Sequence, residues 1–186
     1  MNRVIAVRAG VAAVCALLLS GCIDSTDPIL SDAQPVFGPR LNLALYSLRE
    51  GYAHDPEHAA FTWNGGLYIH ADGGLREVSG FTVHPFEAGD DIIESIPAKN
   101  QGVTEYALLH KLAEGVYQVV PIDEADADEQ TRAAYCKQVE KSGCRIGTRE
   151  QLFAFARATQ AQRKDSGGLA IRLPDNPEKK KPSRRR

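Results

Sequence analysis

The sequence has no apolar run long enough to span a bilayer, which takes about 20 residues. Its longest such run, "AGVAAVCALLL" from Ala9 to Leu19, is interrupted by no charge but is too short. There is also no G-x-S-x-G turn for a hydrolase nucleophile, no Walker A loop and no dinucleotide-binding glycine fingerprint. Without a strong catalytic or cofactor motif, a non-enzymatic role is favoured over an enzymatic one, and no cofactor is expected.

The body of the chain is short of positive charge. From Cys22 to Pro177 there are 14 Lys and Arg against 23 Asp and Glu, a balance of −9. Nucleic-acid-binding domains need a basic face, so no nucleic-acid partner is expected. The last nine residues, "EKKKPSRRR", reverse this with six bases and one acid. A solvated C-terminus explains them; the alternative is contact with an anionic surface through Lys179, Lys180, Lys181, Arg184, Arg185 and Arg186.

The first residues have the layout of a secretory signal peptide, with Arg3 and Arg8 before the apolar run and small residues after it. The run ends in Leu19-Ser20-Gly21-Cys22, which resembles the lipobox of bacterial lipoprotein precursors. The resemblance implies cleavage after Gly21 and acyl chains such as palmitate on Cys22, the one covalent lipid expected. Two or three chains make such a membrane anchor stable.

The resemblance also implies a location. Ile23, not Asp, follows the lipidated cysteine. In the enteric lipoprotein system this points to the outer membrane, with the protein facing the periplasm. The alternative is an ordinary signal peptide followed by a chance cysteine.

Cysteine is otherwise scarce. Cys136 and Cys144 are the two that remain beyond the signal peptide and Cys22. In the oxidising periplasm a disulfide between them is the default, and their C-x7-C spacing is not the C-x-x-C of thiol oxidoreductases.

The chain divides into four parts. We expect a signal peptide over residues 1–21, a lipidated cysteine and flexible tether over 22–40, a globular domain over 41–173 and a disordered basic tail over 174–186. The tether assignment depends on the three prolines and weak periodicity of "IDSTDPILSDAQPVFGPR".

Short strands fill the first two thirds of the domain. Asn64-Gly65 predicts a hairpin turn within "AFTWNGGLYIHA", and Gly115 closes a second hairpin between "TEYALLHKL" and "VYQVVPI". "TEYALLHKL" also fits a helix capped by Thr104, but the short loop favours a strand. Leu169 to Leu173 is a candidate last strand.

Two helices follow the strands. "DADEQTRAAYCKQVEKSG" has acids in its first turn, and "GTREQLFAFARATQAQR" begins with a capping box of Thr148 and Gln151. The expected fold is therefore α+β: an antiparallel sheet of short strands and hairpins followed by two C-terminal helices, in a single small domain.

Histidines are the only dense ligand-type cluster, in "HDPEH" from His54 to His58. A zinc site is the weaker interpretation, because Pro56 favours a capped turn in which the two imidazoles are not on one helix face. The acidic "DEADADE" from Asp123 to Glu129 resembles a calcium loop but lacks its glycine, so helix capping is preferred.

Aromatic residues concentrate in the strand region: Tyr46, Tyr52, Trp63, Tyr68, Phe81 and Phe86. They are expected in the core, or alternatively on an exposed binding face. The leading function is that of a lipid-anchored envelope protein that binds another envelope protein or the cell-wall polymer, or assists an assembly. The alternatives are an unrecognised periplasmic hydrolase or metalloenzyme, and a module that binds a small ligand or peptidoglycan.

Overall fold

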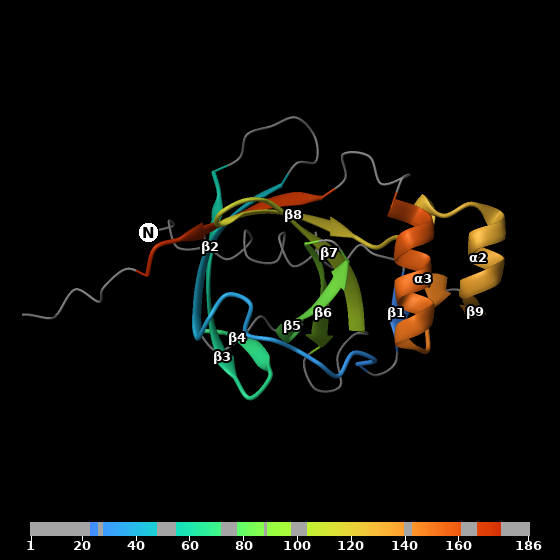
Figure 1. The fold of residues 1–186 in the computed structure, drawn as a ribbon, viewed down its shortest axis with the longest axis horizontal. Coiled ribbons are helices and arrows are strands. Elements are labelled where there is room, and N and C mark those ends of the chain that lie inside the picture. Colours follow the sequence, from blue (N-terminus) through green and yellow to red (C-terminus); the bar gives the residue numbers. More distant parts are fainter. Residues whose placement is uncertain are drawn as a thin grey trace, which may run out of the picture.

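A computed structural model describes residues 23–25, 28–47, 55–71, 78–87, 89–97, 104–139, 143–160 and 167–175. Eight of its strands form a ring in which every strand pairs antiparallel with both neighbours. In ring order they are β2 (Arg40–Ser47), β3 (Glu57–Asn64), β4 (Leu67–His70), β5 (Val78–Glu87), β6 (Asp90–Pro97), β7 (Thr104–Ala113), β8 (Val116–Pro121) and β11 (Gly168–Leu173). The pairing of β11 with both β2 and β8 closes the barrel (Figure 1).

The predicted α+β fold, an open sheet followed by two helices, is therefore wrong. The described residues form a closed eight-stranded antiparallel barrel that carries two short α-helices. The sequence order concealed this, because the closing strand β11 comes after both helices and is brought back between β2 and β8. Closure pairs the strand edges that an open sheet would leave exposed.

The predicted hairpins are confirmed. Gly65 and Gly66, with φ of 60° and 104°, make the turn between β3 and β4, and Gly115, with φ of 72°, makes the turn between β7 and β8. "TEYALLHKL" forms strand β7. Its residues from Thr104 to Leu109 are buried on both faces, which is why their apolar pattern resembled that of a helix.

The two helices lie together on one side of the barrel (Figure 1). α3 (Arg149–Gln160) begins with the predicted cap, in which Gln151 N–H donates to Thr148 Oγ1 at 3.2 Å. The predicted apolar face is confirmed, with the buried residues Leu152, Phe155, Ala156 and Thr159. These pack on the outer face of the barrel against Ile92, Tyr106, Leu108 and Val120.

The first predicted helix is much shorter than expected. α2 spans only Glu129–Tyr135, capped by Asp128, whose carboxylate accepts from Thr131 N–H at 2.7 Å. The chain then turns extended at Cys136 and forms β9 (Lys137–Val139), which pairs with β10 (Gly143–Arg145). The predicted disulfide between Cys136 and Cys144 is present in this region.

The described residues of the segment 23–39, which are 23–25 and 28–39, are packed on the barrel, contrary to their assignment to a flexible tether. Ile23–Ser25 forms strand β1, which pairs with β7 and β10. Ile23, Leu30 and Phe37 are buried.

No helix among the described residues has the length and apolarity needed to cross a bilayer.

Candidate functional site

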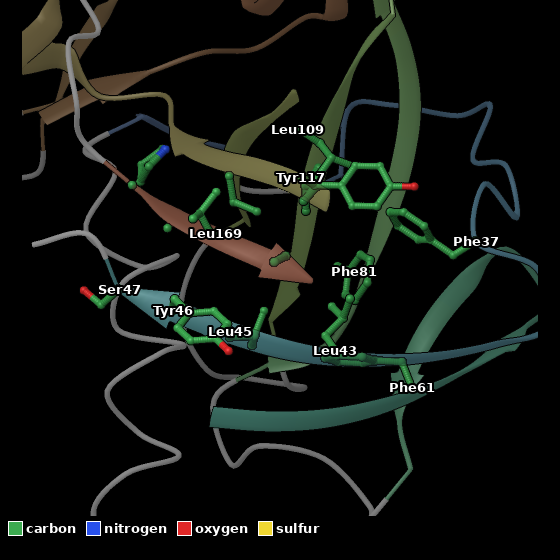
Figure 2. Close-up of a pocket in the computed structure, with 16 residues that line it drawn as sticks. Phe37, Leu43, Leu45, Tyr46, Ser47, Phe61, Phe81, Leu109, Tyr117 and Leu169 are labelled. Carbon is green, nitrogen blue, oxygen red and sulfur yellow. The ribbon is translucent and has the colours of Figure 1, made fainter. Parts of the chain in front are cut away.

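A cavity of about 100 Å³ lies inside the barrel (Figure 2). Successive side chains along a strand point to opposite faces of the sheet, so alternate residues line the interior of the barrel. On β2, for example, Leu43 and Leu45 line the cavity. At the end where β2 stops and β11 begins, consecutive residues of both strands contribute to the lining. The described residues that line it are Phe37, Leu43, Leu45, Tyr46, Ser47, Phe61, Phe81, Ile93, Leu109, Tyr117, Val119, Pro121, Gly167, Gly168, Leu169 and Ala170.

Phe37 closes one end of the cavity. Its ring meets Tyr117 edge-on with centroids 5.2 Å apart and lies 5.8 Å from Tyr68. The Phe37 N–H donates to the Tyr68 hydroxyl at 2.9 Å, and that hydroxyl donates to the Gly38 carbonyl at 3.0 Å. Burial raises the pKa of Tyr68, which keeps the phenol protonated and able to donate.

The cavity reaches the opposite end of the barrel, where β2 ends at Ser47 and β11 begins at Gly168. Gly167 has a φ of +126°, and a Cβ there would lie 2.1 Å from the Val119 carbonyl oxygen. A Cβ at Gly168 would lie 2.8 Å from the Tyr46 carbonyl oxygen. Only glycines permit so close an approach of β11 to its two neighbours.

The lining determines what the cavity can hold. The lining side chains that belong to described residues are aliphatic or aromatic, apart from the hydroxyls of Ser47, Tyr46 and Tyr117, and none of these side chains carries a charge. Removing a charged group from water into such surroundings would be costly. An uncharged apolar group is therefore the chemistry that this cavity accommodates.

A second cluster, fully polar, is buried on the outer face of the barrel. Glu94 and His84 are both 0% exposed, with His84 Nε2 at 3.6 Å from Glu94 Oε2 and 2.7 Å from Thr82 Oγ1. Glu94 Oε1 accepts from the backbone N–H groups of Ile29 at 2.9 Å and Leu30 at 3.3 Å. Beside it, burial raises the pKa of Tyr106, whose hydroxyl lies 2.7 Å from Ser25 Oγ. Ile29 and Leu30 belong to the segment between Ile23 and Pro39, which covers this polar cluster. The role of the cluster is therefore to hold that segment on the barrel.

The histidines of the sequence prediction do not come together. His58 is exposed on β3, which begins at Glu57, so the expected capped helical turn is a strand; His54 lies outside the described residues. His110 is exposed and pairs with Asp90, and His70 packs edge-on against Phe61. In the described part of the chain, no group of three or more His, Cys, Asp or Glu is arranged to hold a metal ion.

The acidic stretch acts as the capping interpretation predicts. The Asp123 carboxylate accepts from Ala125 N–H at 2.9 Å and caps a short 3₁₀ helix, Glu124–Asp126, just before α2.

Of the described aromatic residues that the sequence singled out, Tyr68 is buried and Tyr46, Trp63, Phe81 and Phe86 are partly buried, so none of these five lies on an exposed face. Trp63, Tyr68 and Phe81 pack together in the barrel interior, with neighbouring ring centroids 4.9 and 5.1 Å apart. Phe86 contacts Phe153 of α3 at 5.0 Å. Tyr52 lies outside the described residues.

The two predicted contacts with the envelope also lie outside the described residues: Cys22, and the basic residues from Lys179 to Arg186. The sequence did not identify the cavity itself. The sequence features that could have indicated an interior cavity are the alternating Leu41, Leu43 and Leu45 of β2 and the apolar Phe37 in the segment assigned as a tether. Comparison with protein-family models, with curated proteins and with solved structures finds no match for this chain.

Proposed function

We propose that this protein is a lipid-anchored, non-enzymatic binding module of the bacterial envelope, whose barrel takes a small apolar ligand or the apolar end of an amphiphile. The observation that carries the ligand proposal is the cavity inside the barrel, in which no described lining residue carries a charge. The anchor at Cys22, and with it a place on the outer membrane facing the periplasm, rests on the lipobox resemblance.

Size limits the ligand. A cavity of about 150 Å³ holds one benzene ring, and this cavity measures about 100 Å³. A short alkyl segment of about four carbons is therefore the scale of group that fits. At about 0.8 kcal/mol per buried CH₂, its burial contributes about 3 kcal/mol. That corresponds to a Kd in the millimolar range, so tighter binding would come from the rest of the ligand at the end near Ser47.

The ligand proposal is tested by calorimetric titration of the protein with 1-hexanol. Val119 is part of the lining, so Val119→Phe replaces its isopropyl group by a larger phenyl ring that fills part of the cavity. Gln118→Phe is the matched control, because it adds the same ring at the preceding residue of β8. Gln118 pairs with Leu169 and His110 and is not in the lining of the cavity. We expect millimolar binding to the wild type and the control, and binding at least tenfold weaker to Val119→Phe. Equal affinity for Val119→Phe, or no binding to the wild type, would contradict the proposal.

The anchor is tested separately. Cells that express the wild type or Cys22→Ser are labelled with radioactive palmitate and fractionated. The wild type should carry label in the membrane fraction, and the variant should carry none and keep its signal peptide. Equal labelling of the two proteins would refute lipidation at Cys22.

A further inference from the structure

The segment from Ile23 to Pro39, called here the N-terminal strap, is attached to the barrel along its whole described length. Ile23 is 0% exposed. Gln34 N–H donates to the Val83 carbonyl of β5 at 3.0 Å, and the Pro39 carbonyl accepts from Trp63 N–H at 3.0 Å. Among the described residues, attachment therefore begins at the first residue after Cys22, and further contacts are made up to Pro39, just before β2.

The start of the strap is held from both sides. β1 runs antiparallel to β7, with Asp24 opposite Glu105, and parallel to β10, with Ile23 opposite Cys144. Cys144 is itself bonded to Cys136. The disulfide thus fixes the strand that pairs with Ile23.

Polar contacts secure the middle of the strap. Glu94 accepts from the N–H groups of Ile29 and Leu30, as described above. Arg149 of α3 donates to both carboxylate oxygens of Asp32, at 2.7 and 2.6 Å. These bonds join the strap to β6 and to α3, on the same side of the barrel as β1.

From this geometry we infer that the domain sits directly on the bilayer, with the side that carries β1 and β10 toward the lipid. The inference rests on the proposed lipidation of Cys22. Adjacent Cα atoms are about 3.8 Å apart, so an acylated Cys22 would lie one residue from a fully buried position of the fold. A free tether of 17 residues would instead separate the domain from the lipid by about 21–25 Å as a flexible coil. The partner of this face is therefore the surface of the membrane.

The test uses the chain from Cys22 onward, which contains every described residue, coupled through the Cys22 thiol to maleimide lipid in phosphatidylcholine vesicles. Chemical coupling makes the result independent of lipidation in cells. Energy transfer to dansyl-labelled headgroups is measured from two tryptophan positions. One is Trp63, the single tryptophan of the chain. It is on β3, which is four strands away, in either direction around the barrel, from β7, the strand that pairs with β1.

The second donor is placed near the anchor by Gly147→Trp in a Trp63→Phe background. Gly147 is exposed and follows β10 by two residues. A Cβ there meets only the Gln151 side chain, at 3.7 Å. The matched control inserts twelve Gly and Ser residues between Cys22 and Ile23, which adds about 17–21 Å of flexible chain. Near-ultraviolet circular dichroism confirms that each variant is folded.

If the domain is seated directly, the donor at position 147 should transfer at least twice as efficiently as Trp63, and the inserted spacer should bring the ratio close to one. Equal transfer from the two donors without the spacer, or greater transfer from Trp63, would overturn the inference while leaving lipidation and ligand binding untouched.

Discussion

Glu94 is the side chain whose removal should most clearly separate the N-terminal strap from the barrel. It is fully buried, and its Oε1 is the acceptor for the N–H groups of Ile29 and Leu30. Glu94→Ala leaves the buried Leu30 N–H and the part-buried Ile29 N–H without this acceptor. An unsatisfied buried group costs about 1–3 kcal/mol and a part-buried one less, so the variant should lose about 1–4 kcal/mol of unfolding free energy.

Urea denaturation at pH 7 gives the free energy of unfolding, and hydrogen exchange followed by NMR gives the protection of the two amides. We expect faster exchange at Ile29 and Leu30 together with the loss of stability. Glu94→Gln retains one acceptor oxygen and should lose less than half as much. Glu114→Ala, at an exposed turn, is the control and should leave both measurements unchanged.

The reasoning would be refuted by a Glu94→Ala protein within about 0.5 kcal/mol of the wild type, the range typical of surface substitutions, with unchanged protection of the two amides. Such a result would mean that the strap is held by its other contacts, without a contribution from these two hydrogen bonds.

Three further predictions concern other parts of the chain. Replacing Cys136 and Cys144 together by serine should cost about 2.5 kcal/mol in urea denaturation, the loop entropy for nine residues; an unchanged midpoint would contradict this. The Arg149 guanidinium, through its hydrogen bond and charge, lowers the pKa of Asp32 below the ordinary 3.8. This pair therefore stabilises the fold above that pH, and its contribution is lost as pH falls through the lowered pKa. Arg149→Ala should return the Asp32 titration, followed by carboxyl NMR, toward 3.8, and an unmoved titration would refute the pairing. Deleting residues 179–186 should abolish low-salt sedimentation of lipid-free protein with anionic vesicles or purified cell wall; identical sedimentation would show a merely solvated tail.

Local structure could be predicted from this sequence wherever the signal is local. The turn glycines Gly65 and Gly115 and the Thr148 cap each act through a few neighbouring residues, and each prediction is confirmed. The disulfide followed from the small number of cysteines and the expected compartment.

Closure of the barrel could not be predicted in this way, because it depends on a pairing between distant residues. Ala170 of β11 lies opposite Leu45 on one side and Tyr117 on the other, far away in the chain. Nothing in the short segment "GLAIRL" specifies either partner. The cavity depends on that closure, so it escaped prediction as well.

The helix after Asp128 was overestimated for a different reason. Its charge pattern extends beyond Tyr135, but Cys136 is extended and bonded to Cys144. The strap was misjudged because its prolines and polar residues resemble a linker, whereas the groups that hold it, such as Glu94, are on strands far along the chain.

Methyl NMR during titration with 1-hexanol tests the central claim, that the barrel binds an apolar group, most directly. Leu43, Leu45 and Val119 line the cavity. Leu152 belongs to α3 and packs on the outer face of the barrel, so its methyl groups serve as the control. We predict saturable shifts at the three cavity residues with one millimolar-range Kd, and no shift at Leu152. Unchanged cavity methyls at saturating alcohol, or equal shifts at Leu152, would contradict the account.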